Sequence, residues 1–128
     1  MTEPRHLRVM IIDDASLVRR YYRETLERAG HRVDEAMNGL EALEKLLRQP
    51  ADLLIVDINM PKMDGLTFLK TLRRQTGMIA SVPTLVMSTE ATEADFLAAR
   101  QAGANFYLVK PIAPEVLLDH VSLLGGAA

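Results

Sequence analysis

Cysteine is absent from this chain of 128 residues, which excludes disulfide bonds, thiolate-bound zinc and cysteine nucleophiles. The sequence also lacks any apolar run near the roughly 20 residues that a membrane-spanning helix requires, and its start, MTEPRHLRVM, lacks the apolar stretch of a secretory signal. Neither charge sign is in large excess, because 15 Lys and Arg residues are matched by 17 Asp and Glu residues, for a formal net charge of -2. We therefore expect a cytoplasmic protein that binds neither nucleic acid nor membrane.

What is present is an average globular composition, with 48% hydrophobic and 25% charged residues. A chain of this length can bury one core, so we predict a single domain over residues 1–128. The chain ends in GGAA, and we expect no output domain to follow it. The segment RRYYRETLER, residues 19–28, interleaves its arginines with Glu24 and Glu27, and we interpret it as the solvated face of a helix.

Five short apolar or β-branched runs alternate with segments of helical periodicity. The runs, which we predict to be strands, span residues 7–12, 32–36, 53–56, 84–87 and 106–109. Between them apolar residues recur at helical spacing, as at Leu40, Leu43 and Leu47. Gly103 stands where a helix would end, and Pro114 where one would begin. The alternation predicts an α/β fold, a doubly wound parallel sheet of five strands, and the more polar run 32–36 is predicted to lie at its edge.

Polar residues follow most of these strands. Asp13 and Asp14 come after the first strand, Asp57 after the third, Ser88 after the fourth and Lys110 after the fifth. Each has an ordinary structural explanation when taken alone, as a helix cap, a turn former or a solvated lysine. However, ligands of open parallel sheets bind beyond the carboxyl ends of the strands, where these residues should meet. Three carboxylates gathered there repel each other unless a cation lies among them.

Mg²⁺ is the cation that we expect, because it prefers hard oxygen ligands, few carboxylates, retained waters and a phosphate oxygen. Lys110 adds a second positive charge, and the hydroxyl of Ser88 can bind an anionic oxygen. This layout suits phosphoryl transfer. Asp57, the most central carboxylate, would be the nucleophile and would form an acyl phosphate.

Four segments, in order along the chain and each at a predicted strand, resemble response regulator receiver domains, and among these the single-domain, CheY-like type. They are IIDDAS, LIVDINMPKMDG, VMSTEA and QAGANFYLVKP. The resemblance extends over nearly the whole chain, from Leu7 to about Leu124. It implies a flavodoxin-like, three-layer sandwich with strand order 2-1-3-4-5.

The resemblance also implies roles for the acidic residues. Asp57 would be the phosphoacceptor and also a Mg²⁺ ligand, together with Asp13, Asp14 and the backbone carbonyl of Asn59. Asn59 and Glu90 would flank the path of an attacking water and so influence the lifetime of the acyl phosphate.

The remaining roles concern the switch. Ser88 would be the switch hydroxyl, at a position where Thr is commoner in the family. Lys110 would bind the phosphate and would be joined to Pro111 by a cis peptide bond. Tyr107 would be the aromatic residue that moves inward with the hydroxyl, although an ordinary edge-strand aromatic explains it equally well.

These roles describe a stand-alone response regulator of a two-component system, with a histidine kinase as phosphodonor and chemotaxis or motility as a candidate process. The expected contact surface for a downstream protein is the fourth helix, the fifth strand and the fifth helix. We expect a monomer or a weak, phosphorylation-dependent dimer. We also expect self-catalysed phosphotransfer and slow autodephosphorylation rather than enzymatic turnover.

Four alternatives remain at this point. A phosphorelay shuttle to a histidine phosphotransfer protein fits the same residues. An aspartyl-phosphate phosphatase would need a second acid two residues after Asp57, where this chain has Asn59. A flavodoxin-like cofactor binder would need a phosphate-cradling loop after the first strand, where DDAS would repel phosphate. A degenerate receiver acting only as a scaffold is disfavoured, because every acidic, hydroxyl and lysine position is occupied.

Overall fold

The computed structural model describes residues 6–60 and 63–125. Its elements are, in chain order, β1 (Arg8–Ile12), α1 (Ser16–Arg28), β2 (Arg32–Ala36), α2 (Gly39–Arg48), β3 (Leu53–Asp57), α3 (Gly65–Arg73), the 3-10 helix η1 (Met78–Ser81), β4 (Thr84–Ser88), α4 (Glu93–Ala102), β5 (Phe106–Val109) and α5 (Pro114–Leu124). The alternation of strand and helix predicted from the sequence is confirmed, whereas η1 was not predicted. Within residues 6–60 and 63–125, no helix combines the length and apolarity needed to cross a membrane.

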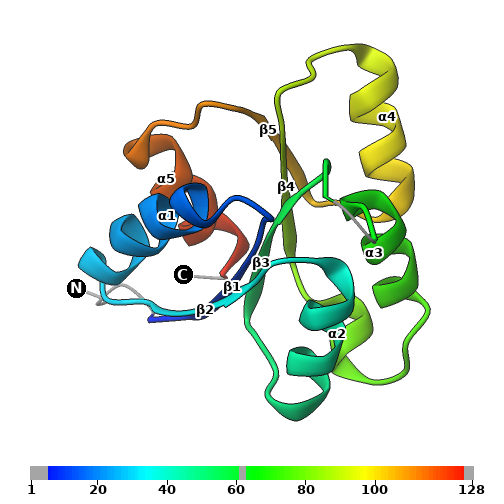
Figure 1. Ribbon diagram of the computed structural model, residues 1–128, viewed down its shortest axis with the longest axis horizontal. Helices are drawn as coiled ribbons and strands as arrows, with labels where there is room; N and C mark the ends of the chain where they lie inside the picture. The colour runs from blue at the N-terminus through cyan, green and yellow to red at the C-terminus, as the bar shows by residue number, and fades with distance from the viewer. Residues whose placement is uncertain (1–5, 61–62, 126–128) are drawn as a thin grey trace.

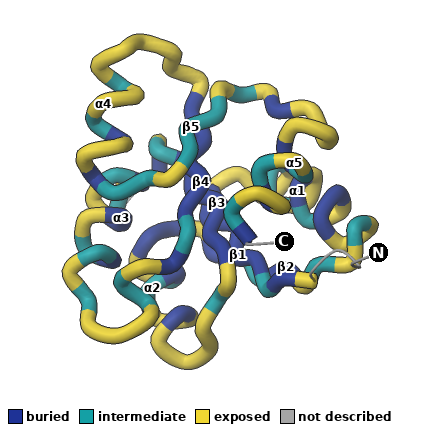
Figure 2. The backbone as a smooth tube through the Cα atoms, turned by 180° about the vertical axis from the view of Figure 1, so that it is seen from behind, coloured by how far each residue is buried: buried dark blue, intermediate teal, exposed yellow. Residues whose placement is uncertain are grey.

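The strands form one parallel sheet in the order β2-β1-β3-β4-β5. Helices α1 and α5 cover one face, and α2, α3 and α4 cover the other, which gives three layers (Figure 1). The predicted strand order and the edge position of β2 are therefore confirmed. Seen from behind, the buried central strands run between helices whose outer surfaces are exposed (Figure 2).

Two apolar cores lie on opposite sides of the sheet. Successive residues of a strand point to opposite faces, so Ile11 and Ile55 pack with α1 and α5, while Ile12 and Val56 pack with α2, α3 and α4. All four are fully buried. Burial on both faces explains why β1 and β3 are nearly continuous apolar runs rather than alternating ones.

The central strands β3 and β4 extend one residue further than predicted. Asp57 and Ser88 are therefore the last residues of their strands rather than the first residues after them. In the ladder, Asp57 is aligned with Met87 of β4, and Ser88 with Val109 of β5. The backbone that carries the carboxylate and the hydroxyl thus has the rigidity of a buried sheet.

The start of α3 lies against the end of β3. Asp64 caps this helix by accepting a hydrogen bond from the Thr67 N–H at 2.8 Å, and the Gly65 N–H donates to the carbonyl of Ile58 at 2.9 Å. A Cβ atom at Gly65 would collide with the backbone of Asp57, so glycine is required for this close approach. The turn residues Pro61 and Lys62 of the same motif lie outside the described residues.

Candidate functional site

Three carboxylates meet at the carboxyl edge of the sheet. Asp57 ends β3, while Asp13 and Asp14 directly follow β1. One carboxylate oxygen from each of the three side chains lies within 4.8 Å of the other two. The side chains of Asp13 and Asp57 are only 1% and 6% exposed, whereas Asp14 is exposed to solvent. The cluster is therefore a buried pair of acids with a third acid at its mouth.

Lys110 joins the two buried acids. Its Nζ lies 3.0 Å from Asp13 Oδ2 and 3.3 Å from Asp57 Oδ1, and its side chain is 18% exposed. Lys110 is therefore not a solvated lysine. The following bond to Pro111, which the resemblance implies to be cis, is cis in the structure. One ammonium group leaves three carboxylates only partly neutralised, so the site retains an excess of negative charge.

The ionisation of the site reflects this imbalance. Burial, followed by the charge of Asp13, raises the pKa of Asp57 above its ordinary value, and the opposing effect of Lys110 is smaller. For Lys110, burial lowers the pKa, but the hydrogen bonds and charges of Asp13 and Asp57 together raise it above the ordinary value. Lys110 is thus held as a cation, and Asp57 is a carboxylate that a further positive charge would stabilise.

The donor set fits Mg²⁺. All three side chains offer hard carboxylate oxygens, and the exposure of Asp14 leaves the mouth of the cluster open to water, which this ion tends to retain. Asn59 is close to the same acid, since its N–H donates to Asp57 Oδ1 at 3.3 Å. Asp13, Asp14 and Asp57 are therefore the residues able to hold the metal through their side chains.

Ser88 and Tyr107 are linked through one residue, Glu90. The Glu90 N–H donates to Ser88 Oγ at 3.0 Å, and the Tyr107 hydroxyl donates to the Glu90 carbonyl at 2.9 Å. The Tyr107 ring also packs edge-on against Phe96 of α4, with 4.6 Å between ring centroids. Ser88 does not cap α4, because Thr92 occupies the cap. A change at Ser88 therefore has a direct hydrogen-bonded path to Tyr107.

The comparisons with known proteins agree with this site. The family model described as the response regulator receiver domain matches residues 9–122. The chain belongs to this family. The receiver domain is 37% identical over 122 residues to chemotaxis protein CheY1 of Helicobacter pylori, which covers 94% of this chain and 98% of the relative. It is 38% identical over 115 residues to a chemotaxis protein CheY homolog of Campylobacter jejuni, with 88% of each chain covered.

A solved structure gives the same result for the fold. The chemotaxis response regulator CheY4 of Vibrio cholerae superposes on this receiver domain with a TM-score of 0.87 and 34% sequence identity, covering 94% of this chain and 99% of the other. The resemblance to single-domain, CheY-like receivers inferred from the four motifs is therefore confirmed. Receiver domains of this type are signalling switches rather than turnover enzymes.

One interpretation of the receiver domain's sequence is wrong. Segment 19–28 is not uniformly a solvated helix face, because the side chain of Arg19 is only 13% exposed. It donates to the Asp13 carbonyl at 2.6 Å and to Glu35 at 2.9 Å. Arg20, with a side chain 75% exposed, does fit the interpretation. The sequence feature that could have indicated a paired arginine is Glu35, because an acidic residue within a strand requires a positively charged partner.

Proposed function

We propose that this receiver domain acts over residues 1–128 as a stand-alone response regulator, which accepts a phosphoryl group on Asp57 from a histidine kinase in a Mg²⁺-dependent step. The observation that carries the proposal is the 3.3 Å contact between Asp57 Oδ1 and Lys110 Nζ at the rigid end of β3. Asp13 and Asp14 lie beside it with two further carboxylates. The site thus combines a nucleophile, a fixed cation and metal ligands.

In the proposed reaction, a carboxylate oxygen of Asp57 attacks the phosphorus of the kinase phosphohistidine. The phosphorus–nitrogen bond breaks, its electron pair stays on the imidazole, and the product is an acyl phosphate on Asp57. Lys110 binds the phosphoryl oxygens from the side on which it now holds Asp57. When bound, Mg²⁺ supplies charge neutralisation at the carboxylates and the phosphoryl oxygens.

The proposed switch begins at Ser88. Phosphorylation adds roughly two negative charges, and the Ser88 hydroxyl turns to donate to a phosphoryl oxygen. It then gives up the hydrogen bond from the Glu90 N–H, and Tyr107, which is held by the carbonyl of the same residue, responds. The change reaches α4, β5 and α5, which form the proposed contact surface for a downstream protein.

The lifetime of the acyl phosphate depends on access of water to it. Asn59 and Glu90 are both exposed at the mouth of the site, and we propose that they tune slow, self-catalysed dephosphorylation. A phosphatase-type enzyme is not proposed, because Asn59 cannot act as a general acid or base. The names of the Helicobacter pylori and Campylobacter jejuni relatives favour a role in chemotaxis over a role in a phosphorelay. We propose that the protein acts in the cytoplasm, where it would meet its kinase and its target.

The first test is phosphorylation by a small donor. Purified protein incubated with acetyl phosphate and Mg²⁺ should gain one phosphate by intact mass spectrometry, and Asp57→Asn should gain none. Asp119→Asn, which alters an exposed aspartate of α5, should be labelled like the wild type. Labelling that persists in Asp57→Asn would refute the assignment. Phosphate release over many turnovers at a rate far above self-hydrolysis would instead restore the phosphatase reading.

The second test concerns the contacts. Beryllium fluoride with Mg²⁺ mimics the phosphoryl group without transfer, so sedimentation of the protein with and without it separates a constant monomer from a phosphorylation-dependent dimer. Substitution of Phe96, which is 40% exposed beside Tyr107, should change binding of a candidate target without changing labelling of Asp57. Loss of labelling would show that Phe96 serves the site rather than the contact surface.

A further inference from the structure

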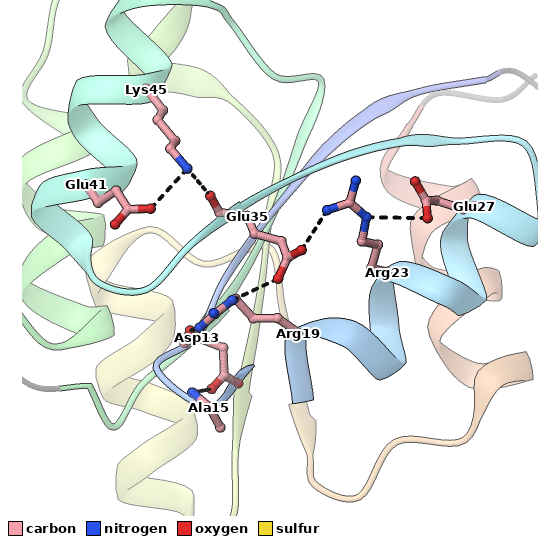
Figure 3. A network of polar contacts seen from close by, with 8 residues as sticks. All are labelled: Asp13, Ala15, Arg19, Arg23, Glu27, Glu35, Glu41 and Lys45. Atoms are coloured by element: carbon pink, nitrogen blue, oxygen red, sulfur yellow. Dashed lines mark hydrogen bonds and ion pairs between the residues drawn. The ribbon is translucent and has the colours of Figure 1, made fainter. Parts of the chain in front are cut away.

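A chain of polar contacts extends from the acidic site to the edge strand β2 (Figure 3). Arg19, in the first turn of α1, donates from Nη1 to the backbone carbonyl of Asp13 at 2.6 Å, and from Nε to Glu35 Oε1 at 2.9 Å. Glu35 belongs to β2, and its other oxygen accepts from Arg23 Nη1 at 2.7 Å. The guanidinium of Arg19 thus donates from Nη1 to the acidic site and from Nε to the side chain of a β2 residue.

Glu35 is itself fixed from two sides. Lys45 of α2 donates to its backbone carbonyl and also pairs with Glu41 at 3.0 Å. Although burial favours the neutral form of Glu35, hydrogen bonds from Arg23 and Arg19 outweigh this and lower its pKa below the ordinary value. The carboxylate is therefore charged at neutral pH and forms a rigid base for Arg19.

Asp13 is held at its backbone N–H, its side chain and its backbone carbonyl. The Asp13 N–H donates to the Ala36 carbonyl of β2 at 3.0 Å, and its Oδ1 accepts from the Ala15 N–H at 2.9 Å. The bond from Arg19 fixes the Asp13 carbonyl, and hence the plane of the peptide that leads into Asp14. This peptide sets the direction in which the exposed Asp14 side chain leaves the backbone.

We propose that Arg19, neutralised and aimed by Glu35, is a positioning residue that holds Asp13 and Asp14 in the geometry required for Mg²⁺ binding. The inference rests on the proposed metal site and adds residues that do not touch the metal. Groups that orient the ligands of a metal contribute to its affinity because they reduce the ordering that binding requires. Here the carboxylate of Glu35 also offsets a positive charge that would otherwise oppose a cation nearby.

The proposal makes a prediction opposite to that of charge alone. Arg19→Met removes a positive charge close to three carboxylates, so simple electrostatics expects tighter Mg²⁺ binding. Our proposal predicts the opposite, because loss of the positioning contact should weaken Mg²⁺ binding by about tenfold or more. Arg20→Met is the matched control, because it makes the same charge change one residue along, on a side chain 75% exposed that pairs with Glu24.

The experiment is a Mg²⁺ titration of the wild type and both variants by calorimetry, with the amide resonances of Asp13, Asp14 and Asp57 followed by NMR. Arg19→Met should bind at least about tenfold more weakly than wild type, while Arg20→Met binds equally or slightly more tightly. Acetyl phosphate labelling of Arg19→Met should need more Mg²⁺ but should reach the wild-type rate at saturation. Equal or tighter binding by folded Arg19→Met would overturn the proposal.

A second variant covers the case in which Arg19→Met does not fold. Arg19→Lys keeps the charge but has a single ammonium group that cannot reproduce the two-sided contact, so its Mg²⁺ binding should also weaken. Wild-type affinity in Arg19→Lys would overturn the proposal in the same way. If the wild type shows no saturable Mg²⁺ binding, the proposed function fails. If the wild type binds Mg²⁺ and the Arg19 variants bind it with the same affinity, only the proposed role of Arg19 fails.

Discussion

At the scale of the residue, Asp57, which we propose as the phosphoacceptor, combines two demands that oppose each other. A nucleophilic carboxylate must be charged, yet its side chain is 6% exposed and lies beside Asp13. Burial and the charge of that neighbour raise its pKa, and Lys110 compensates only in part. The free protein therefore holds an acid whose ionised form costs stability, and a metal or a phosphoryl group changes this balance.

This cost predicts that Asp57→Asn stabilises the metal-free protein at pH 7, by roughly 1 kcal/mol, or about 3–5 °C for a domain of this size. The pKa of Asp57 is higher in the folded protein than in the unfolded chain, so protonation of this side chain stabilises the fold. This stabilisation is fully present at pH values below the ordinary pKa of Asp and is lost as the pH rises through the raised pKa. The difference between the two proteins should thus shrink as pH falls. Thermal unfolding in EDTA between pH 7 and pH 4 measures it, and a less stable Asp57→Asn at pH 7 would contradict the account.

At the scale of the element, Arg73 connects the end of α3 to the loops before β4 and after α4, at the end of the sheet opposite the acidic site. It is the last residue of α3, and its guanidinium donates to the carbonyl of Val82 at 2.7 Å and to that of Gly103 at 2.8 Å. The first carbonyl precedes β4 and the second follows α4. One side chain therefore satisfies the backbone of two loops that the strand ladder does not reach.

Arg73→Met should lower the free energy of unfolding by about 2–3 kcal/mol, because the Gly103 carbonyl loses the guanidinium and the buried Val82 carbonyl keeps only the 3.1 Å hydrogen bond from the Thr84 hydroxyl. Urea unfolding followed by circular dichroism measures the change. The neighbouring Arg74 is exposed, and Arg74→Met should alter stability by no more than about 0.5 kcal/mol. Equal effects of the two substitutions would show that the contacts of Arg73 with the loops contribute little.

At the scale of the whole molecule, the sheet joins groups that are distant in sequence. Lys110 and Asp13 are separated by 97 positions, yet their side chains lie 3.0 Å apart because β5 and β1 end at the same edge. The site exists only when all the strands between them are in register. Binding at this edge is therefore linked to the folding of the whole domain.

Mg²⁺ should accordingly stabilise the entire fold. At a concentration tenfold above its dissociation constant, an ion that binds only the folded state adds about 1.4 kcal/mol, which corresponds to about 4–7 °C in melting temperature. Differential scanning fluorimetry over a range of MgCl₂ concentrations tests this, with KCl at equal ionic strength as the control. Asp13→Asn should reduce the shift strongly, and an identical shift in that variant would place the ion elsewhere.

Much of this receiver domain is determined by local sequence. The apolar runs fix the strands, the helical spacing between them fixes the connections, and the polar run 32–36 marks an edge strand, because each depends only on which residues must leave water. The placement of Asp13, Asp57, Ser88 and Lys110 at one edge follows from the same alternation. The segment around Asp57 also carries its own glycine, Gly65, for the close approach of α3.

Tertiary structure decided which polar groups actually meet. Nothing in the spacing of segment 19–28 separates the buried Arg19 from the exposed Arg20, since the difference arises when α1 packs beside β2 and Glu35 comes within reach. The link from Ser88 to Tyr107 through Glu90 likewise depends on the register of β4 and β5. Hydrophobic burial is encoded by local pattern, but the partners of charged and polar side chains depend on long-range geometry, which only the folded chain sets.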